Sequence, residues 1–278
     1  MSKRFSFLLV LFVLLVLILS GCSTSSARKG CLGDASTAIE DLNCRQITIA
    51  VENAYLPFNY ISTETGEAGG WDYDTWTELC TRLHCEPVFV ESGWDGLIQS
   101  VATGQYDVGA DGITKTPDRL DQVDFSIGYV QIQQKLLAVK GELRFSTIED
   151  FASNPDLVLG SQISTSNYET AVKYLSEERI KGFDNVPFAV QALIAGDVDA
   201  VILDEIVGMG YQGTNAESLE LIGPSISSDE LGFIFQKGSD LLDPVDKAIQ
   251  SMIDDGTMAA LNLKYFGPDF KLTYDDIE

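Results

Sequence analysis

The sequence predicts an α/β protein with two similar lobes, and three observations support that fold class. From residue 46 onward, short apolar segments alternate with amphipathic segments of helical periodicity, which is typical of βαβ units. The segments LIQSVATGQYDVGADGI and QALIAGDVDAVILDE resemble each other, since each combines a helical pattern, a glycine, an aspartate and an apolar strand. A hydrophobic content of 45% in 278 residues also allows a sizeable core.

The first 21 residues predict a secretory signal that is not part of the fold. Lys3 and Arg4 precede one apolar run over 5–19, which is shorter than the ~20 residues of a membrane-spanning helix. The run ends in Leu-Ser-Gly-Cys, which resembles the bacterial lipobox and implies cleavage before Cys22 and acylation of its thiol. An uncleaved N-terminal anchor is the alternative. Residues 22–45 are expected to form a tether.

The first half of the fold is predicted from apolar spacing and from glycine punctuation. The helix at 72–83 has apolar residues at helical spacing, and Gly104 follows the next helix in the usual C-terminal position. The predicted elements are strands at 47–51, 87–90 and 106–110, and helices at 72–83 and 94–103.

The second half repeats the pattern, and the chain then ends in two helices. Gly196 closes one predicted helix, and a Gly-Pro pair at 267–268 ends the last one. The predicted strands are 136–139, 157–159, 200–203 and 232–235, and the predicted helices are 146–151, 168–175, 186–195, 242–253 and 258–266.

The cysteines beyond Cys22 predict disulfides. Four cysteines allow three pairings, and export places them where disulfides persist. Cys80 and Cys85 lie at a helix end and the following strand start, so we pair them and leave Cys31 with Cys44. A metal site is the alternative, but there is no Cys-x-x-Cys, and the single histidine, His84, is expected to be a solvated turn residue.

The charge balance excludes some partners. The chain has 18 basic and 42 acidic residues and a net charge of −24, which argues against binding nucleic acid or anionic lipid by charge. We expect no cofactor and no metal.

Candidate binding residues follow the predicted strands, because ligands of open α/β sheets collect at the carboxyl ends of strands. A guanidinium suits a carboxylate bidentately, and a carboxylate such as Asp204 suits an ammonium, so together they suit a zwitterion. The residues at or just after strand ends are Glu52, Tyr55, Asp111, Gly112, Thr114, Arg119, Ser164, Thr165 and Asp204.

These stretches resemble the polar amino-acid-binding proteins of bacterial ABC importers, which are family 3 solute-binding proteins with the type II periplasmic fold. The resemblance is carried by GGWDYDTWTELCTRL (69–83), WDGLIQSVATGQYDVGADGITKTPDRLDQVDFSIGYV (94–130), GDVDAVILDE (196–205) and IDDGTMAALNLKYFG (253–267). It implies two Rossmann-like α/β lobes joined by a two-strand hinge near 136–139 and 232–235. Lobe 1 is then 46–136 plus 232–278, and lobe 2 is 137–231. Some members also have a disulfide in the region of Cys80 and Cys85.

The resemblance also implies how the α-groups of an amino acid would be held. Arg119 would bind the α-carboxylate, with the backbone N–H groups of Thr114 and Thr165. The Thr114 hydroxyl, the Gly112 carbonyl and Asp204 would hold the α-ammonium.

The resemblance implies roles for three more residues of the pocket, and the sequence departs from the family pattern at two positions. Tyr55 and Trp94 would sandwich the ligand side chain, while Ser164 would arrive with lobe 2 on closure. Ile163 begins the segment that replaces the family's Gly-Thr-Thr, and Asp111 stands where a small residue is common.

Glu52 and Asp111 predict the class of ligand. Both are expected at the end of the pocket where the ligand side chain lies, and an unpaired carboxylate in a closed cleft loses hydration. A cationic side chain of the arginine, lysine or ornithine type would offset that loss, and the aromatic pair would add cation–π attraction. One alternative is a neutral polar ligand. Another is that Asp111 is a turn residue that binds nearby backbone N–H groups. An acidic ligand would meet like charge.

The predicted function is amino-acid capture and delivery to the membrane subunits of an ABC permease. We expect a monomer that is extracytoplasmic, in a periplasm or at the outer cell surface, anchored to the membrane through lipid on Cys22. It is not expected to be an enzyme. One alternative is an enzyme like cyclohexadienyl dehydratase, with Glu52, Asp111 or Glu205 doing proton work. The other is a ligand-sensing subunit or adhesin.

Overall fold

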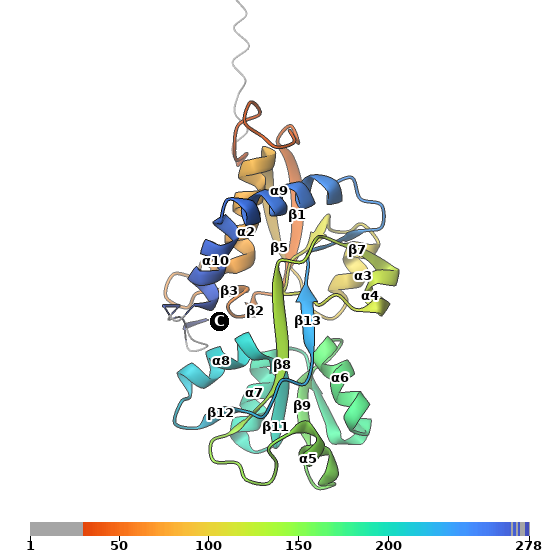
Figure 1. Ribbon diagram of the computed structural model, residues 1–278, viewed down its shortest axis with the longest axis vertical. Coiled ribbons are helices and arrows are strands. Elements are labelled where there is room, and N and C mark those ends of the chain that lie inside the picture. The colour runs from red at the N-terminus through yellow and green to blue at the C-terminus, as the bar shows by residue number, and fades with distance from the viewer. Residues whose placement is uncertain (1–29, 268, 271, 273–275, 278) are drawn as a thin grey trace, which may run out of the picture.

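The two-lobed α/β fold predicted from the sequence is confirmed by the structure, a computed structural model (Figure 1). It describes residues 30–267, 269–270, 272 and 276–277. The predicted signal at 1–21 and the predicted lipidation site Cys22 lie outside the described residues. Across the part of the chain described, no helix combines the length and the apolar character needed to cross a membrane.

The first lobe is built on a five-stranded sheet of order β5-β1-β6-β14-β7. β1 is parallel to both β5 and β6, whereas β14 is antiparallel to β6 and β7. The expected mostly parallel sheet is therefore mixed, because the chain returns from the second lobe in the reverse direction. The strands are β1 (Arg45–Val51), β5 (Cys85–Glu91), β6 (Val108–Gly109), β7 (Val123–Phe125) and β14 (Ile234–Gln236).

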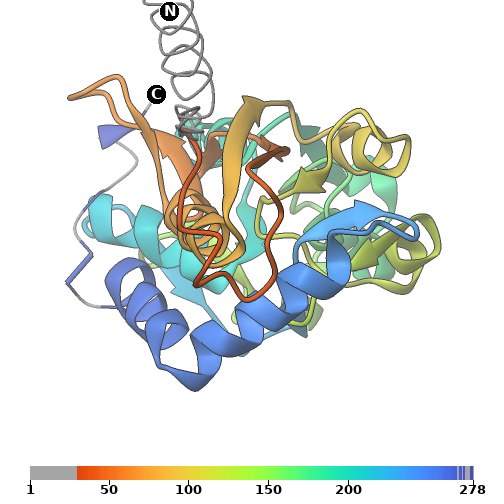
Figure 2. The same ribbon diagram turned by 90° about the horizontal axis from the view of Figure 1, so that it is seen from above.

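Helices cover this sheet, and a small hairpin sheet stands beside it. The apolar stripe of α2 is fully buried through Trp71, Trp76 and Leu79, and α9 and α10 follow one flank of the lobe (Figure 2). The helix predicted from residue 94 begins only at Leu97, because Gly96 has a left-handed φ of 89°. The elements are α2 (Trp71–Leu83), α3 (Leu97–Ala102), α4 (Pro117–Gln122), α9 (Leu242–Asp254), α10 (Thr257–Phe266), β2 (Ala54–Tyr55), β3 (Asn59–Ile61) and β4 (Ala68–Gly69).

The second lobe has a sheet of order β10-β9-β11-β8-β12. A helix was expected to follow the strand at 200–203, but no bounds were predicted for it, and the glycines at 208, 210 and 213 of α8 weaken a helical pattern. Tertiary packing of Val207 and Tyr211, both buried on one face, overrides that propensity. The elements are β8 (Val130–Val139), α5 (Ile148–Ser153), β9 (Leu159–Gln162), α6 (Ser166–Tyr174), η1 (Glu177–Arg179), β10 (Ile180–Phe183), α7 (Val186–Ala195), β11 (Ala200–Asp204), α8 (Glu205–Thr214) and β12 (Leu219–Ile222).

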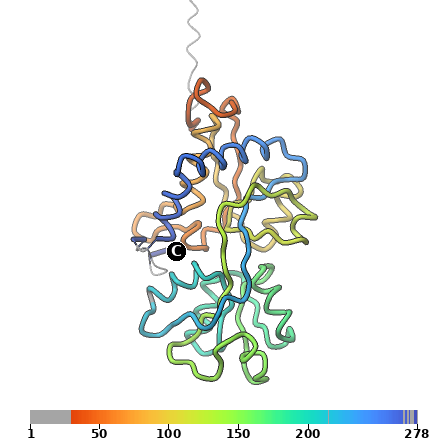
Figure 3. Tube along the Cα trace, viewed as in Figure 1, coloured from red at the N-terminus to blue at the C-terminus, as the bar shows by residue number. Residues whose placement is uncertain are grey.

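Two antiparallel segments connect the lobes, and Figure 3 shows them running side by side. They are the first part of β8 and β13 (Ser228–Leu231), which pair over residues 130–133 and 228–231. Residues 136–139, expected near the hinge, instead pair with β11 and β12 inside the sheet of the second lobe. The paired connecting segments, 130–133 and 228–231, therefore precede the expected ones, 136–139 and 232–235, along the sequence.

Both predicted disulfides form, Cys31–Cys44 and Cys80–Cys85. The loop closed by the first one packs on the turn between α2 and β5. Its backbone N–H groups at Leu32, Ile39 and Leu42 donate to carbonyl oxygens of that turn region. The described end of the predicted tether is thus docked on the first lobe.

Candidate functional site

A pocket lies between the lobes, at the carboxyl ends of β1 and β6 on one side and of β9 and β11 on the other. In each sheet these are the neighbouring strands where the chain order reverses, the usual ligand position in such folds. The pocket has about 470 Å³ of empty space, a volume that includes space open to solvent. It is lined by the predicted residues Glu52, Tyr55, Trp94, Asp111, Gly112, Thr114, Arg119, Thr165 and Asp204, joined by Gln162, Ser166 and Asn167.

Arg119 is the buried cation of the pocket. It lies on α4, which Thr116 caps by accepting a hydrogen bond from the Arg119 N–H, and it is 4% exposed. Its guanidinium donates to the carbonyl oxygens of Thr114, at 3.0 Å, and Ser164, at 3.3 Å. Burial lowers the pKa of Arg119 from its ordinary value, yet a guanidinium remains charged in proteins. Within the part of the chain that the structure describes, these are the hydrogen bonds of the guanidinium, so its other N–H donors can bind an anionic group.

Asp204 is the acid that faces the pocket from the second lobe. It ends β11, is 2% exposed, and accepts hydrogen bonds from the Tyr55 hydroxyl and from Asn167 Nδ2, the latter at 3.1 Å. Burial raises the pKa of Asp204 to about 6, while these two hydrogen bonds act in the opposite direction. At neutral pH a carboxylate therefore stands across the pocket from a guanidinium carried by the other lobe.

Glu52 and Asp111 form an acidic pair elsewhere in the pocket. Glu52 Oε1 accepts from Gln162 Nε2 at 2.9 Å, whereas Oδ2 of the buried Asp111 has no partner among the described residues. Burial raises the pKa of Glu52 to about 8, and the charge of Asp111 adds to that shift. Burial also raises the pKa of Asp111 to about 7. This pair therefore retains protons near neutral pH.

A third acid, Asp72, is linked to this pair through Asn59. The two N–H groups of Asn59 Nδ2 donate to Asp111 Oδ1, at 2.6 Å, and to Asp72 Oδ2, at 2.9 Å. Asn59 Oδ1 in turn accepts from the Asn53 N–H at 2.7 Å. Burial raises the pKa of Asp72 well above its ordinary value. Sequence reasoning missed this link because Asn59 lies in an unpredicted hairpin and Asp72 reads as an ordinary first-turn acid of a helix.

Tyr55 and Trp94 form aromatic walls of the pocket, but each already has a partner. Tyr55 stacks on Phe58, with 5.5 Å between ring centroids. The guanidinium carbon of Arg119 lies 5.2 Å from the centroid of the Trp94 ring. Gly112 allows the close approach to Tyr55, since its φ is 56° and a Cβ there would lie 2.9 Å from the Tyr55 ring.

Ser164 is the predicted site residue that does not line the pocket. Its φ of 60° directs its hydroxyl outward, where it donates to Asp95 Oδ1 at 2.9 Å. Its carbonyl oxygen accepts from Trp94 Nε1 at 3.1 Å as well as from Arg119. The unusual backbone of this segment thus falls on Ser164 rather than on Ile163, and Ser164 joins the two lobes.

Gln162, Ser166 and Asn167 are pocket residues that were not singled out from the sequence. Gln162 ends β9, so the strand-end rule that selected Asp204 also applies to it. Ser166 and Asn167 open α6 directly after its N-cap, Thr165. Ser166 Oγ donates to Thr114 Oγ1 across the lobes at 3.2 Å.

Comparison with known proteins identifies a family of similar proteins. A model of the bacterial extracellular solute-binding proteins, family 3, matches residues 47–268. The L-cystine-binding protein TcyA of Bacillus subtilis (strain 168) is 28% identical over 227 residues, covering 80% of this chain and 82% of TcyA.

Two further relatives have other ligands in their names. A probable histidine-binding protein of Campylobacter jejuni is 25% identical over 267 residues, covering 95% of this chain and 99% of that protein. The solved structure of an ancestral arginine-binding protein bound to arginine superposes with a TM-score of 0.75 at 30% identity, covering 80% of this chain and 98% of the other.

Proposed function

The chain belongs to the bacterial extracellular solute-binding proteins of family 3, and we propose that it captures a cationic amino acid between its two lobes. The observation that carries the proposal is a pocket with two charge patterns. Arg119 and Asp204 face each other from different lobes, and Glu52 and Asp111 form an uncompensated acidic pair. The ligand type is that of arginine, lysine or ornithine.

The opposed charges suit the α-groups that all amino acids share. The free N–H donors of Arg119 match a carboxylate in geometry and charge, and Asp204 matches an ammonium. Because Arg119 belongs to lobe 1 and Asp204 to lobe 2, a zwitterion between them stabilises the closed arrangement. Closure then requires both α-groups, as expected for hinge motion coupled to binding.

The acidic pair supports the choice of a cationic side chain. Relatives of similar identity have names that specify cystine, histidine or arginine, so family membership leaves the side chain open. An ammonium or guanidinium beside Glu52 and Asp111 would let both acids ionise, whereas a neutral side chain would leave them protonated. A ligand carboxylate would add another acid to the cluster.

Calorimetry with arginine, lysine, glutamine and glutamate tests the proposal. We expect arginine or lysine to bind at least about 30-fold more tightly than glutamine, which corresponds to about 2 kcal/mol. Native mass spectrometry of the protein as purified would identify any retained ligand independently. Tightest binding of glutamate, or equal binding of glutamine and arginine, would contradict the cationic assignment.

Delivery to the permease subunits of an ABC importer and anchoring at Cys22 complete the proposed role. The family supports an extracytoplasmic amino-acid-binding protein of an importer. The lipid anchor is proposed from the sequence motif at Cys22. We also propose that the chain is a monomer. Labelled fatty acid should enter the parent chain in cells but not Cys22→Ala, and the chain should elute as a monomer.

An enzyme activity is the second candidate, because Glu52 holds a proton at neutral pH. A carboxyl group with a pKa of about 8 can act as a general acid. The sequence resemblance indicates cyclohexadienyl dehydratase chemistry, with prephenate or arogenate as substrate. Incubation with both compounds decides the matter: turnover that disappears in Glu52→Gln supports an enzyme, and absence of product supports capture alone.

A further inference from the structure

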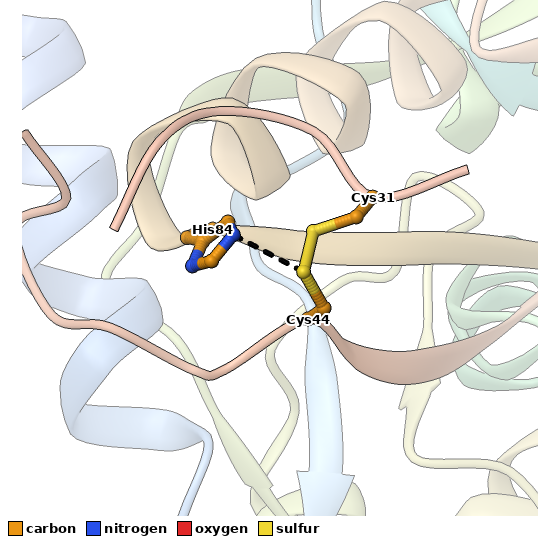
Figure 4. A group of neighbouring side chains, drawn as sticks. All are labelled: Cys31, Cys44 and His84. Atoms are coloured by element: carbon orange, nitrogen blue, oxygen red, sulfur yellow. Dashed lines mark hydrogen bonds between the residues drawn. A yellow bond between two sulfur atoms is a disulfide. The ribbon is translucent and has the colours of Figure 1, made fainter. Parts of the chain in front are cut away.

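Cys31, Cys44 and His84 form a compact cluster on the first lobe, away from the interlobe pocket (Figure 4). The two sulfur atoms and a ring nitrogen of His84 all lie within 4.8 Å of one another. His84 Nε2 is 3.1 Å from Cys44 Sγ. Amino-acid capture uses none of these groups.

The His84 ring is held so that one nitrogen is aimed at sulfur. Its Nδ1 lies 2.7 Å from Asp41 Oδ1, and since an ionised carboxylate only accepts hydrogen bonds, Nδ1 carries the proton. In the neutral imidazole, Nε2 then presents a lone pair to Cys44 Sγ. A disulfide sulfur has no hydrogen to donate, so this lone pair faces a group that cannot satisfy it. His84 thus lies in the helix-to-strand turn expected from the sequence, but its ring is largely buried and is oriented by Asp41.

The same arrangement is the usual surrounding of a metal-bound histidine. Ligating histidines donate their second ring N–H to a carboxylate, which fixes the tautomer and the ring orientation. Here Asp41 would take that role, and Nε2 would be the ligand atom.

The backbone holds the two cysteines in place independently of the bond between them. Cys44 N–H donates to the His84 carbonyl oxygen, and Leu32 N–H, next to Cys31, donates to the Cys85 carbonyl oxygen, both at 2.9 Å. Leu42 N–H donates to the Leu83 carbonyl oxygen at 2.9 Å as well. Cleavage of the disulfide would thus leave both sulfur atoms close to Nε2.

We propose that the reduced form of this cluster binds Zn²⁺ through the thiolates of Cys31 and Cys44 and Nε2 of His84, with a solvent molecule as fourth ligand. Two thiolates and an imidazole are a set that zinc prefers, and tetrahedral coordination is its usual geometry. The second disulfide, Cys80–Cys85, has no such histidine within the described residues.

The chemistry requires a dithiol reductant, and it balances in two steps. The dithiol transfers two electrons and two protons to the Cys31–Cys44 bond, so that it becomes a disulfide itself and leaves two thiols on the protein. Zn²⁺ then displaces the two thiol protons. Disulfide and metal exclude each other, and either one closes the loop between Cys31 and Cys44.

Cobalt and zinc titrations of the purified chain test the site. The protein is reduced with a phosphine, which is removed under anaerobic conditions before Co²⁺ is added. We expect one Co²⁺ per chain, with thiolate-to-cobalt charge transfer and the visible bands of tetrahedral cobalt, both abolished by stoichiometric Zn²⁺. Bound Zn²⁺ should protect Cys31 and Cys44 from alkylation, read by peptide mass spectrometry, and leave Cys80 and Cys85 unprotected. The oxidised parent should bind neither metal.

Two variants distinguish the metal ligand, His84, from the residue that orients its ring, Asp41. His84→Asn keeps a residue that tolerates the left-handed φ of 51° but removes the imidazole, and should weaken Zn²⁺ binding at least about 100-fold. Asp41→Asn keeps the ligands and should weaken it by about 10- to 100-fold. The proposal is overturned if reduced parent binds no metal, if His84→Asn binds as tightly as parent, if protection falls on Cys80 and Cys85, or if reduction unfolds the chain. None of these results bears on amino-acid binding, which is measured separately.

Discussion

The two charged regions of the pocket are built on opposite principles. Arg119 and Asp204 have opposite charges on opposite lobes, and each has neutral hydrogen-bond partners around it. Glu52 and Asp111 have like charges, both belong to lobe 1, and burial raises both pKa values toward neutrality. The first region suits what all amino acids share, whereas the second requires a charge that only some ligands bring. Recognition of the class and selection within it are thus located in different places.

Removal of Arg119 should have the largest effect and should not depend on the side chain of the ligand. Arg119→Ala leaves a ligand carboxylate without its buried partner, which costs about 3 kcal/mol or more, a loss of at least about 100-fold. Calorimetry should show this loss for arginine and glutamine alike. Arg119→Lys, which keeps the charge but not the fork, should fall in between. Unchanged binding by Arg119→Ala would remove the basis of the proposed pocket.

Replacement of Asp111 should change selectivity rather than binding in general. Asp111→Asn keeps the shape and the contact with Asn59 but removes one acid. We expect arginine to bind about 10- to 100-fold more weakly, as for loss of one partner of a buried charge pair, and glutamine to bind as well or better. Asp118→Asn, which removes an exposed acid on α4, is the matched control. An equal loss of affinity for both ligands would mean that Asp111 stabilises the fold and does not select the ligand.

The pH dependence should also differ between ligands. In the free protein Glu52 and Asp111, with pKa values of about 8 and 7, hold protons at pH 6, and a bound cation requires both to ionise. Protons therefore compete with arginine, so its affinity should rise from pH 6 to pH 9, by at most about tenfold per unit for each proton released. Glutamine affinity should rise only about twofold, between pH 6 and pH 7, because Asp204, with a pKa of about 6, then ionises fully. Calorimetry in buffers of different ionisation enthalpy counts the protons released, and Glu52→Gln should release fewer.

The smallest effect is expected at the contact between Asp95 and Ser164, outside the pocket. This exposed interlobe hydrogen bond should contribute about 0.5–1 kcal/mol to closure. Asp95→Asn and Ser164→Ala should therefore weaken arginine and glutamine equally, by about twofold to fivefold, mainly through faster dissociation in stopped-flow measurements. A changed ratio between the two ligands would place this contact within the selective part of the site.

Much of the pocket could be predicted from the sequence because strand ends are local features. An apolar run followed by Asp111 or Asp204 marks a strand and the polar residue that leaves it, and the topology of α/β sheets brings such ends together. The Cys80–Cys85 pairing follows in the same way from a helix end next to a strand start. Elements without a local pattern were missed, such as the hairpin that bears Asn59, and the glycine-containing helix α8 received no predicted bounds.

The sequence by itself determined the α/β class, the charged residues of the pocket and the Cys80–Cys85 pairing, since each depends on neighbours along the chain. The Cys31–Cys44 pairing followed because no other cysteines remained to be paired. Only the tertiary structure decided which way Ser164 points, that Asn59 joins Asp72 to Asp111, and that His84 faces a disulfide formed by Cys31 and Cys44. These relations join residues from different elements. They depend on backbone dihedrals and packing that no local pattern encodes.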